Sequence, residues 1–332
     1  MKSWRRIFVA ALALAAILGG TASAQDQRPT ITIGMPGIPP VFVSVQAYVA
    51  QQQKLFEKYG VNVVLRPFDS GAAAARAVAS GNIDLSMSPS ALIATMISNN
   101  PSVDLVVIYG YEKPDWLLGT LDPSIKRCED VKGKPVGVDS LGGARSIALN
   151  IMLRKCNLKA DDTQQVPLSA NIGAAMISGQ LAIGVLHIDD VPIIEREANK
   201  KVGILIDIND VAKVNHYLSL VASQKATTEK RDALVRVLAA LIEAERFMRD
   251  PKNIDVVAKA AAPTGRSDAD AKWSIREYVK MEFWPHNHGL DQKKLEEVIA
   301  IQKRVGNIKG DAVTYGRLVD LKLYDEALKL VK

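Results

Sequence analysis

Cysteine and histidine are scarce in this chain, which has two of the first and four of the second among its 332 residues. It contains no H-E-x-x-H pair and no recognisable Ser-His-Asp order. The H-x-H pair at His286 and His288 has no further ligands at a known metal spacing. These absences speak against the common hydrolytic and zinc-dependent enzymes. We therefore expect a binding protein rather than an enzyme, with no cofactor.

Long hydrophobic runs are absent beyond the N-terminus. Lys2, Arg5 and Arg6 precede an apolar run at 7–18, which is too short to span a bilayer comfortably, and an A-x-A-like site ends at Ala24. This order predicts a cleaved signal peptide at residues 1–24, export to the periplasm, and no stable membrane insertion after cleavage. An uncleaved N-terminal anchor is the alternative.

A large excess of positive charge is also missing from the mature chain. The full sequence has a formal net charge of +6, and removing the three basic residues of the signal peptide leaves +3. So small a charge gives no electrostatic reason to expect nucleic acid as a partner. The composition is 48% apolar and 23% charged, which is typical of a globular protein, and the length suits two lobes better than one core.

Short apolar runs and helical patterns alternate along the first two thirds of the chain. The expected strands lie at 31–34, 61–65, 83–87, 105–109, 135–138, 164–167, 183–186 and 202–206. Helical patterns separate most of them, which predicts an α/β fold with mostly parallel sheets and helices on both faces. Beyond residue 222 the pattern is only helical, so we expect a helical C-terminal extension.

Two further segments, 116–119 and 217–222, have the composition of strands that cross between lobes. They divide the mature chain into a discontinuous lobe one, 25–116 with 223–332, and a lobe two, 117–222. Two crossings are what a hinged clamshell requires.

A strand, a glycine turn and a helix follow one another between residues 128 and 158. This geometry leaves the first backbone N–H groups of the helix available for an anion or a polar ligand head. Cys128 precedes the strand and Cys156 lies near the end of the helix, which returns beside the strand's start. In an exported protein the two could form a disulfide; two unpaired buried thiols are the alternative.

The run Asp130-Val131-Lys132-Gly133-Lys134-Pro135-Val136-Gly137-Val138 resembles the D-L-K-G-K-x-V-G-V run of ABC-transporter substrate-binding proteins. The nitrate, sulfonate and taurine branch, which includes the thiamine-pyrimidine binders, is the most similar. Segments 80–85 and 315–328 also resemble that branch. The resemblance implies a two-lobe, type II periplasmic-binding-protein clamshell, working as a monomer that delivers a small molecule to an ABC permease.

Four loops should face the cleft, because ligands of α/β sheets bind outside the carboxyl ends of the strands. These loops are 35–42, 88–90, 140–146 and 187–190. The candidate ligand-binding residues are Gly37, Ile38, Phe42, Ser88, Pro89, Ser90, Tyr111, Ser140, Gly142, Gly143, Arg145, His187 and Asp189. The three serines could equally be N-caps, and Tyr111 could belong to the hinge packing.

Arg145 lies in the first turn of its helix, where the helix dipole disfavours a cation. A ligand sulfonate or carboxylate would be a suitable counter-charge, and a solvated or Asp139-paired arginine is the alternative. We therefore predict a small organic anion as the ligand. Two departures from the family pattern, Ala182 and the turn at 140–145, leave open a thiamine-pyrimidine or other heterocycle binder. A pyrimidine-synthase-like enzyme on the same fold would be cytosolic, which the predicted signal contradicts.

Overall fold

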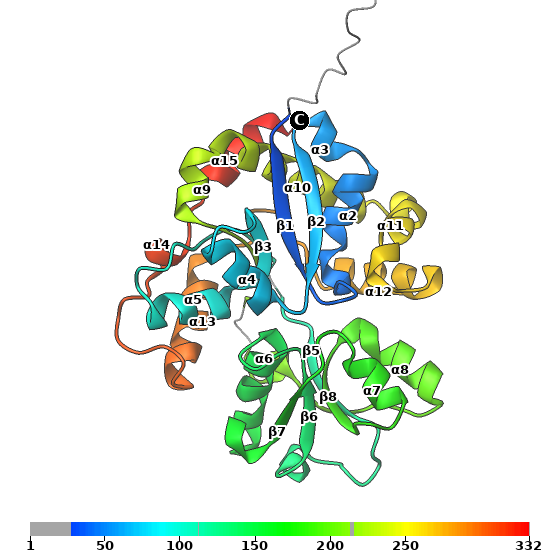
Figure 1. Ribbon diagram of the computed structural model, residues 1–332. Helices are drawn as coiled ribbons and strands as arrows, with labels where there is room; N and C mark the ends of the chain where they lie inside the picture. Colours follow the sequence, from blue (N-terminus) through cyan, green and yellow to red (C-terminus); the bar gives the residue numbers. More distant parts are fainter. Residues whose placement is uncertain (1–27, 112, 213–215, 332) are drawn as a thin grey trace, which may run out of the picture.

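The computed structural model describes residues 28–111, 113–212 and 216–331, so the predicted signal peptide lies outside the described residues. The chain forms two α/β lobes, one above the other in Figure 1, and each lobe is built on its own five-stranded sheet. The predicted two-lobe α/β fold is therefore confirmed. Among the residues described here, no helix is both long and apolar enough to cross a membrane.

The sheet of lobe one has the strand order β2-β1-β3-β10-β4. Its strands are β1 (Thr30–Pro36), β2 (Asn62–Phe68), β3 (Leu85–Pro89), β4 (Val106–Tyr111) and β10 (Leu218–Ala222). β1 pairs with β2 and β3 in parallel, whereas β10 runs antiparallel to β3 and β4. The reversed strand is the one that arrives from the other lobe.

Lobe two repeats this plan with the order β7-β6-β8-β5-β9. Its strands are β5 (Trp116–Thr120), β6 (Pro135–Val138), β7 (Gln164–Pro167), β8 (Ile183–His187) and β9 (Gly203–Asp207). β6 is parallel to β7 and β8, and β5, which also arrives from the other lobe, is antiparallel to β8 and β9.

Helices cover both sheets, and most of them belong to lobe one. Those of lobe one are α2 (Val45–Gln52), α3 (Leu55–Lys58), α4 (Gly71–Ala79), α5 (Ser90–Asn99), α9 (Gln224–Glu229), α10 (Arg231–Arg249), α11 (Ile254–Ala260), α12 (Asp268–Lys280), α13 (Gln292–Arg304), α14 (Tyr315–Leu318) and α15 (Lys322–Leu330). Those of lobe two are α6 (Ala144–Leu153), α7 (Ile172–Ile177) and α8 (Val191–Ala198). Leu234, Leu238 and Leu241 on α10 are fully buried, as its apolar face predicts.

Short 3-10 turns connect many of these elements. They are η1 (Phe42–Ser44), η2 (Cys128–Val131), η3 (Arg154–Cys156), η4 (Ala160–Asp162), η5 (Ile188–Asp190), η6 (Ile208–Asp210), η7 (Pro251–Asn253) and η8 (Ala262–Thr264).

Sheet membership corrects the predicted lobe boundary. The prediction placed 217–222 at the end of lobe two, but β10 hydrogen-bonds to β3 and β4 of lobe one. The crossing therefore ends before Leu218. The strand pattern was read correctly, but a strand's local sequence does not reveal which sheet it joins.

One long helix expected from the sequence is broken. The helical pattern from 41 to 58 forms η1, α2 and α3, separated at Lys54, whose φ of 55° is left-handed. Helical periodicity continues across the break because both pieces bury apolar side chains against the same sheet. Propensity alone therefore did not locate the break.

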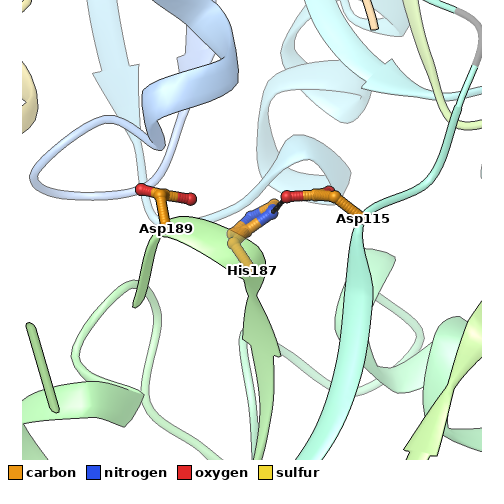
Figure 2. Close-up of side chains that lie close together, drawn as sticks. All are labelled: Asp115, His187 and Asp189. Atoms are coloured by element: carbon orange, nitrogen blue, oxygen red, sulfur yellow. Dashed lines mark hydrogen bonds and ion pairs between the residues drawn. The ribbon is translucent and has the colours of Figure 1, made fainter. Parts of the chain in front are cut away.

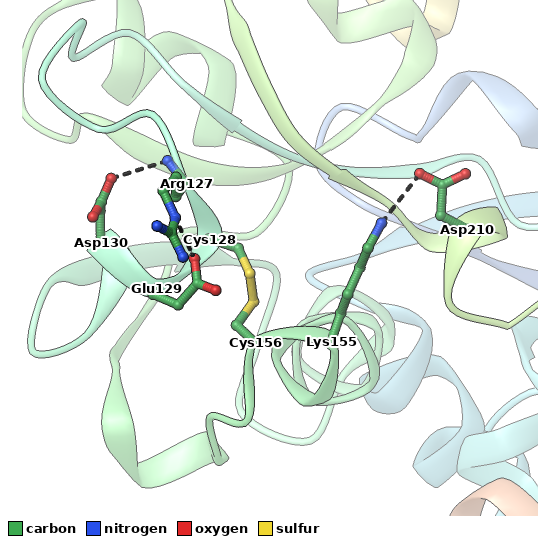
Figure 3. The surroundings of a disulfide bond; sticks show 7 residues. All are labelled: Arg127, Cys128, Glu129, Asp130, Lys155, Cys156 and Asp210. Carbon is green, nitrogen blue, oxygen red and sulfur yellow. Dashed lines mark hydrogen bonds and ion pairs between the residues drawn. A yellow bond between two sulfur atoms is a disulfide. The ribbon is translucent and has the colours of Figure 1, made fainter.

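Cys128 and Cys156 form a disulfide between η2 and η3, with their Cα atoms 6.0 Å apart (Figure 3). Arg127 and Glu129 form an exposed ion pair beside it. The bond joins the two ends of the β6–α6 unit, as the antiparallel return of the helix predicted. It therefore fixes the segment that carries Arg145.

Replacing both cysteines by serine should lower the free energy of unfolding by about 3–4 kcal/mol, because a loop of this length gains chain entropy when it is opened. The sequence separation is 28 residues. Urea denaturation of the parent and of the double variant Cys128→Ser/Cys156→Ser measures the difference. The parent treated with a reductant should approach the variant, and equal stability of all three samples would contradict the prediction.

Candidate functional site

A narrow cavity of about 20 Å³ lies between the lobes, and we call it the head chamber. Its lining is Pro36, Gly37, Val41, Asp69, Ser70, Gly71, Pro89, Trp116, Asp139, Ala144, Arg145, Ser169, Ala170, His187, Tyr217 and Leu218. Both lobes contribute to this wall. Of the predicted site residues, the structure places Gly37, Pro89, Arg145 and His187 in it.

The head chamber is built from segments at the carboxyl ends of six parallel strands. Those segments end or follow β1, β2 and β3 in lobe one and β6, β7 and β8 in lobe two. Parallel strands bring their carboxyl ends to the same sheet edge, so the two edges face each other across the cavity. Sequence reasoning included four of these segments and missed those after β2 and β7, although the same rule applied to them.

The start of α4 is one of the missed elements. Ser70 is its N-cap and accepts a hydrogen bond from the Ala73 N–H at 3.2 Å. The first turn contains no acidic residue. Gly71 packs so closely on β3 that a Cβ would lie 3.1 Å from Pro89 Cδ and 3.3 Å from the Met87 carbonyl oxygen. The helix therefore presents its positive end to the chamber.

The backbone N–H groups at the start of α6 are bound by a side chain of the chain itself, whereas we expected them to be free for a ligand. The Asp139 carboxylate accepts hydrogen bonds from the N–H groups of Ala144 at 3.0 Å and Arg145 at 3.1 Å. The two backbone donors that we expected a ligand to take are thus bound within the chain. A carboxylate at a helix start satisfies the dipole as well as a ligand would.

Arg145 is also paired within the chain. Its side chain is 3% exposed, its Nη1 donates to the Val185 carbonyl at 2.8 Å, and its Nη2 lies 3.4 Å from Asp190 Oδ2. The guanidinium carbon is 5.6 Å from the centre of the Trp116 ring. We expected a ligand to supply the counter-charge of Arg145. The structure pairs Arg145 instead with Asp190, which lies in η5 directly after β8.

His187 lies at the end of β8 and is 1% exposed. Its Nδ1 is 2.8 Å from Asp115 Oδ2 (Figure 2), and its Nε2 has no hydrogen-bond partner in the described part of the chain. Because a carboxylate only accepts, Nδ1 carries a proton and Nε2 is left for a partner from outside the chain.

Asp115, His187 and Asp189 come together in Figure 2 with residue types that can hold a metal ion. However, Tyr278 Oη lies between the two carboxylates. It is within hydrogen-bonding distance of Asp115 and lies 2.7 Å from Asp189 Oδ1. Arg266 further neutralises Asp189. We therefore interpret the cluster as a bridge between the lobes.

Lobe one holds this cluster through three side chains near α12, which we call the interlobe latch. Arg266 Nη2 lies 2.6 Å from both Asp189 Oδ2 and Asp190 Oδ1, and Tyr278 reaches Asp189. Asp270 pairs with Arg196 of α8 at 2.7 Å. Burial alone would raise the pKa of Asp190, but the charges of Arg145 and Arg266 hold that pKa well below its usual value.

Several predicted site residues have other partners. Ser88 Oγ donates to the Gly71 carbonyl at 2.7 Å, and Tyr111 Oη donates to Gln46 at 2.6 Å. Phe42 packs on Tyr278. Ser90 Oγ lies 2.9 Å from His216 Nδ1. These contacts are internal to lobe one or its hinge.

The other predicted residues lie at the cleft's edges. Ile38 is 50% exposed and Gly142 is exposed with a φ of 70°. Gly143 is buried at the N-cap of α6, while Ser140 is half-buried. Asp189 is bound by Arg266 and Tyr278 of the latch.

Two α/β lobes joined by two crossings, with a cavity between opposed strand ends, define a periplasmic-binding-protein fold. The NMT1/THI5-like family model matches residues 42–254, which is more than half of the chain. The chain therefore belongs to the NMT1/THI5-like family. The resemblance seen in the sequence is confirmed.

Solved structures share the fold at low sequence identity. The alkanesulfonate-binding protein SsuA from Xanthomonas axonopodis pv. citri, bound to MOPS, is 15% identical; the match covers 88% of this chain and 98% of SsuA, with a TM-score of 0.69. The periplasmic nitrate-binding protein NrtA from Synechocystis PCC 6803 is 11% identical; the match covers 92% and 90% of the two chains, with a TM-score of 0.74.

A relative in Brucella abortus, named only as a candidate binding protein, is 23% identical over 215 residues. The match covers 64% of this chain and 66% of the Brucella protein, slightly less than two thirds of its length.

Breaking the interlobe latch should separate the lobes. Arg266→Met removes the ion pairs of Arg266 with Asp189 and Asp190. Both carboxylates stay buried without that counter-charge, so the arrangement with the lobes in contact loses stability. Small-angle X-ray scattering should show a larger radius of gyration for the variant than for the parent. The control is Arg276→Met, an exposed arginine within α12, the helix that Arg266 precedes. Equal scattering of Arg266→Met and its control would contradict the role of the latch.

His216 should make stability depend on pH. Burial lowers its pKa to about 3, while the unfolded chain takes up the proton near pH 6.5. Between these values the unfolded state binds more protons, so stability falls as pH is lowered, by up to about 1.4 kcal/mol per pH unit. His216→Gln should reduce this slope in urea denaturation from pH 7 to 4, whereas His286→Gln at an exposed site should keep it. An unchanged slope in His216→Gln would contradict the assignment.

Proposed function

We propose that this protein is the periplasmic solute-binding component of an ABC importer and that it holds a small molecule in the head chamber. The observation that carries the proposal is a cavity walled by the strand ends of both lobes. A ligand there would touch both halves, so its binding would stabilise their contact and could be sensed by a permease. The structural neighbours include the ligand-binding component of an ABC-type import system from Staphylococcus aureus, and the predicted signal peptide supports export.

The charges of the head chamber bear on the ligand class. Its one arginine, Arg145, is paired with Asp190, and Asp139 is bound to the backbone of α6. No cation in the described lining is therefore left without a counter-charge. An anion would instead be held by neutral donors, as at many helix starts. The first turn of α4 beside Gly71 provides such donors, because the Ser70 side chain accepts from the Ala73 N–H and not from the N–H groups of Gly71 and Ala72. His187 Nε2 can accept a hydrogen bond from a protonated group of the ligand.

We infer that the ligand carries a sulfonate or carboxylate group, bound chiefly at the start of α4. The printed names of SsuA and NrtA, for alkanesulfonate and nitrate, support an oxyanion. The heterocycle carrier is the second candidate, because Trp116 and Tyr217 also line the chamber. A neutral or cationic heterocycle would tolerate the nearby carboxylates, whereas an anion would be repelled by any further negative charge.

Ser70 allows the two ligand classes to be distinguished. Ser70→Asp keeps an N-cap of good propensity but places a negative charge at the mouth of α4. We expect the affinity for methanesulfonate, measured by calorimetry, to fall at least about tenfold, which corresponds to about 1.4 kcal/mol.

Ser70→Asn, a neutral cap of the same size as aspartate, is the matched control and should bind within about threefold of the parent. If Ser70→Asp binds methanesulfonate as tightly as Ser70→Asn, the oxyanion does not lie at α4. If the parent binds the thiamine pyrimidine and no sulfonate, carboxylate or nitrate, the heterocycle carrier is correct.

A further inference from the structure

The two sheets have four outer strands, and three of these are protected against pairing with a further strand. β2 and β7 contain Pro67 and Pro167, which have no backbone N–H to donate. β4 is covered by the C-terminal region, where Val107 forms a bridge with Val319 and accepts from the Asp320 N–H at 3.0 Å. Natural proteins block sheet edges in these ways because an open edge attracts other chains.

β9 is the fourth outer strand, and it has no such protection. Its residues, Gly203–Asp207, include no proline. They pair with β5 on one side, and on the other side their backbone groups have no partner among the residues that the structure describes. Ile204 in this strand is 46% exposed. A row of backbone donors and acceptors is therefore available to an incoming strand.

A groove of about 620 Å³ lies beside the start of β9, and we call it the edge groove. Its lining is Thr120, Leu121, Asp122, Pro123, Ile125, Lys126, Lys200, Lys201, Val202, Gly203, Ile204 and Leu205. Thr120 is the last residue of β5, whose first residue, Trp116, lines the head chamber. The edge groove is therefore separate from the head chamber and lies at the opposite end of β5.

The edge groove has an excess of positive charge. Lys126, Lys200 and Lys201 are all exposed, whereas Asp122 is the one carboxylate in the described lining. Lys201 is paired with Glu195 at 2.6 Å. Lys126 and Lys200 form no ion pair with any other residue in the described ranges. Two cations thus stand without a counter-charge beside an open strand edge, and a complementary partner is acidic.

The rest of the lining is mainly apolar. Leu121, Ile125 and Val202 lie in the groove together with the exposed Ile204. Successive side chains of an extended segment point to opposite faces. A segment that alternates acidic and apolar residues therefore matches both the lysines and the apolar surface.

We propose that β9 and the edge groove bind an extended, acidic segment of another protein, which joins the five-stranded sheet of lobe two as a further strand. The backbone of that segment hydrogen-bonds to β9, and its carboxylates contact Lys126 and Lys200. A fatty acid would use the lysines and the apolar surface but would leave the strand edge unpaired. The inference goes beyond the proposed solute binding and does not depend on it.

The test uses the full chain and a fluorescein-labelled, eight-residue peptide that alternates glutamate with valine. Fluorescence anisotropy should show binding that weakens as salt is added, because the lysines are exposed. Two further peptides have either every backbone nitrogen methylated or lysine in place of glutamate. Each should bind at least about tenfold more weakly, since the first loses its backbone donors and the second meets like charges.

Reversing the two unpaired charges assigns the binding to the edge groove. Lys126→Glu/Lys200→Glu should weaken binding of the acidic peptide at least about tenfold and strengthen binding of the lysine peptide, which a loss of folding could not do. Lys159→Glu, at an exposed lysine elsewhere in lobe two, is the matched control and should bind the acidic peptide as the parent does. Methanesulfonate binding, whatever its strength in the parent, should be the same in all three proteins, so the two proposals are tested separately.

Four results would each overturn the acidic partner strand. The parent does not bind the acidic peptide, the methylated peptide binds as tightly as the unmethylated one, the double variant binds like its control, or dodecanoate displaces the acidic peptide. Dodecanoate has a carboxylate and an apolar chain but no peptide backbone, so its success would indicate a lipid. The parent should also sediment as a monomer, and a dimer that dissociates in Ile204→Glu would assign the edge to a second copy of this chain instead.

Discussion

The arrangement of the two lobes depends on charges that are buried between them and must therefore be paired. Arg145, Asp189 and Asp190 from lobe two meet Arg266 from lobe one with little exposure to solvent. Charges in such an environment persist only when counter-charges and hydrogen bonds replace water. Arg145 and Arg266 together balance the charges of Asp189 and Asp190, and Arg266 belongs to the other lobe. Contact between the lobes is thus an electrostatic requirement of this cluster.

This pairing has a consequence for ligand recognition. Because Asp190 and the Val185 carbonyl already bind Arg145, the guanidinium shapes the wall of the head chamber without being a free clamp. If a ligand binds in the head chamber as proposed, its selection depends on neutral donors, on shape and on apolar contact. A binding protein that must release its cargo to a permease does not need a strong ion pair with that cargo, and hydrogen bonds to a helix start give a weaker, adjustable hold.

The sequence predicted those features that depend on neighbours along the chain. The strand–helix alternation, the segment Pro135–Val138 and the return of α6 toward Cys128 follow from local patterns. It did not predict that Asp190, 45 residues away, is the partner of Arg145, or that Arg266 lies beside Asp189 from 77 residues away. Local propensity contains no information about such distances, and the latch was therefore missed entirely.

The position of the latch relative to the head chamber sets how ligand binding can be linked to closure. The latch lies by α12 on one side of the interlobe space, and α6 and α13 lie on the other. On that second side Arg154, just after α6, donates a hydrogen bond to the carbonyl of Arg304 at the end of α13. Polar contacts therefore join the lobes on both sides of the head chamber. A ligand in the head chamber would add contacts between these two sides. Closure would then depend on both the protein's own polar contacts and the ligand, which is the condition for a conformation that reports on occupancy.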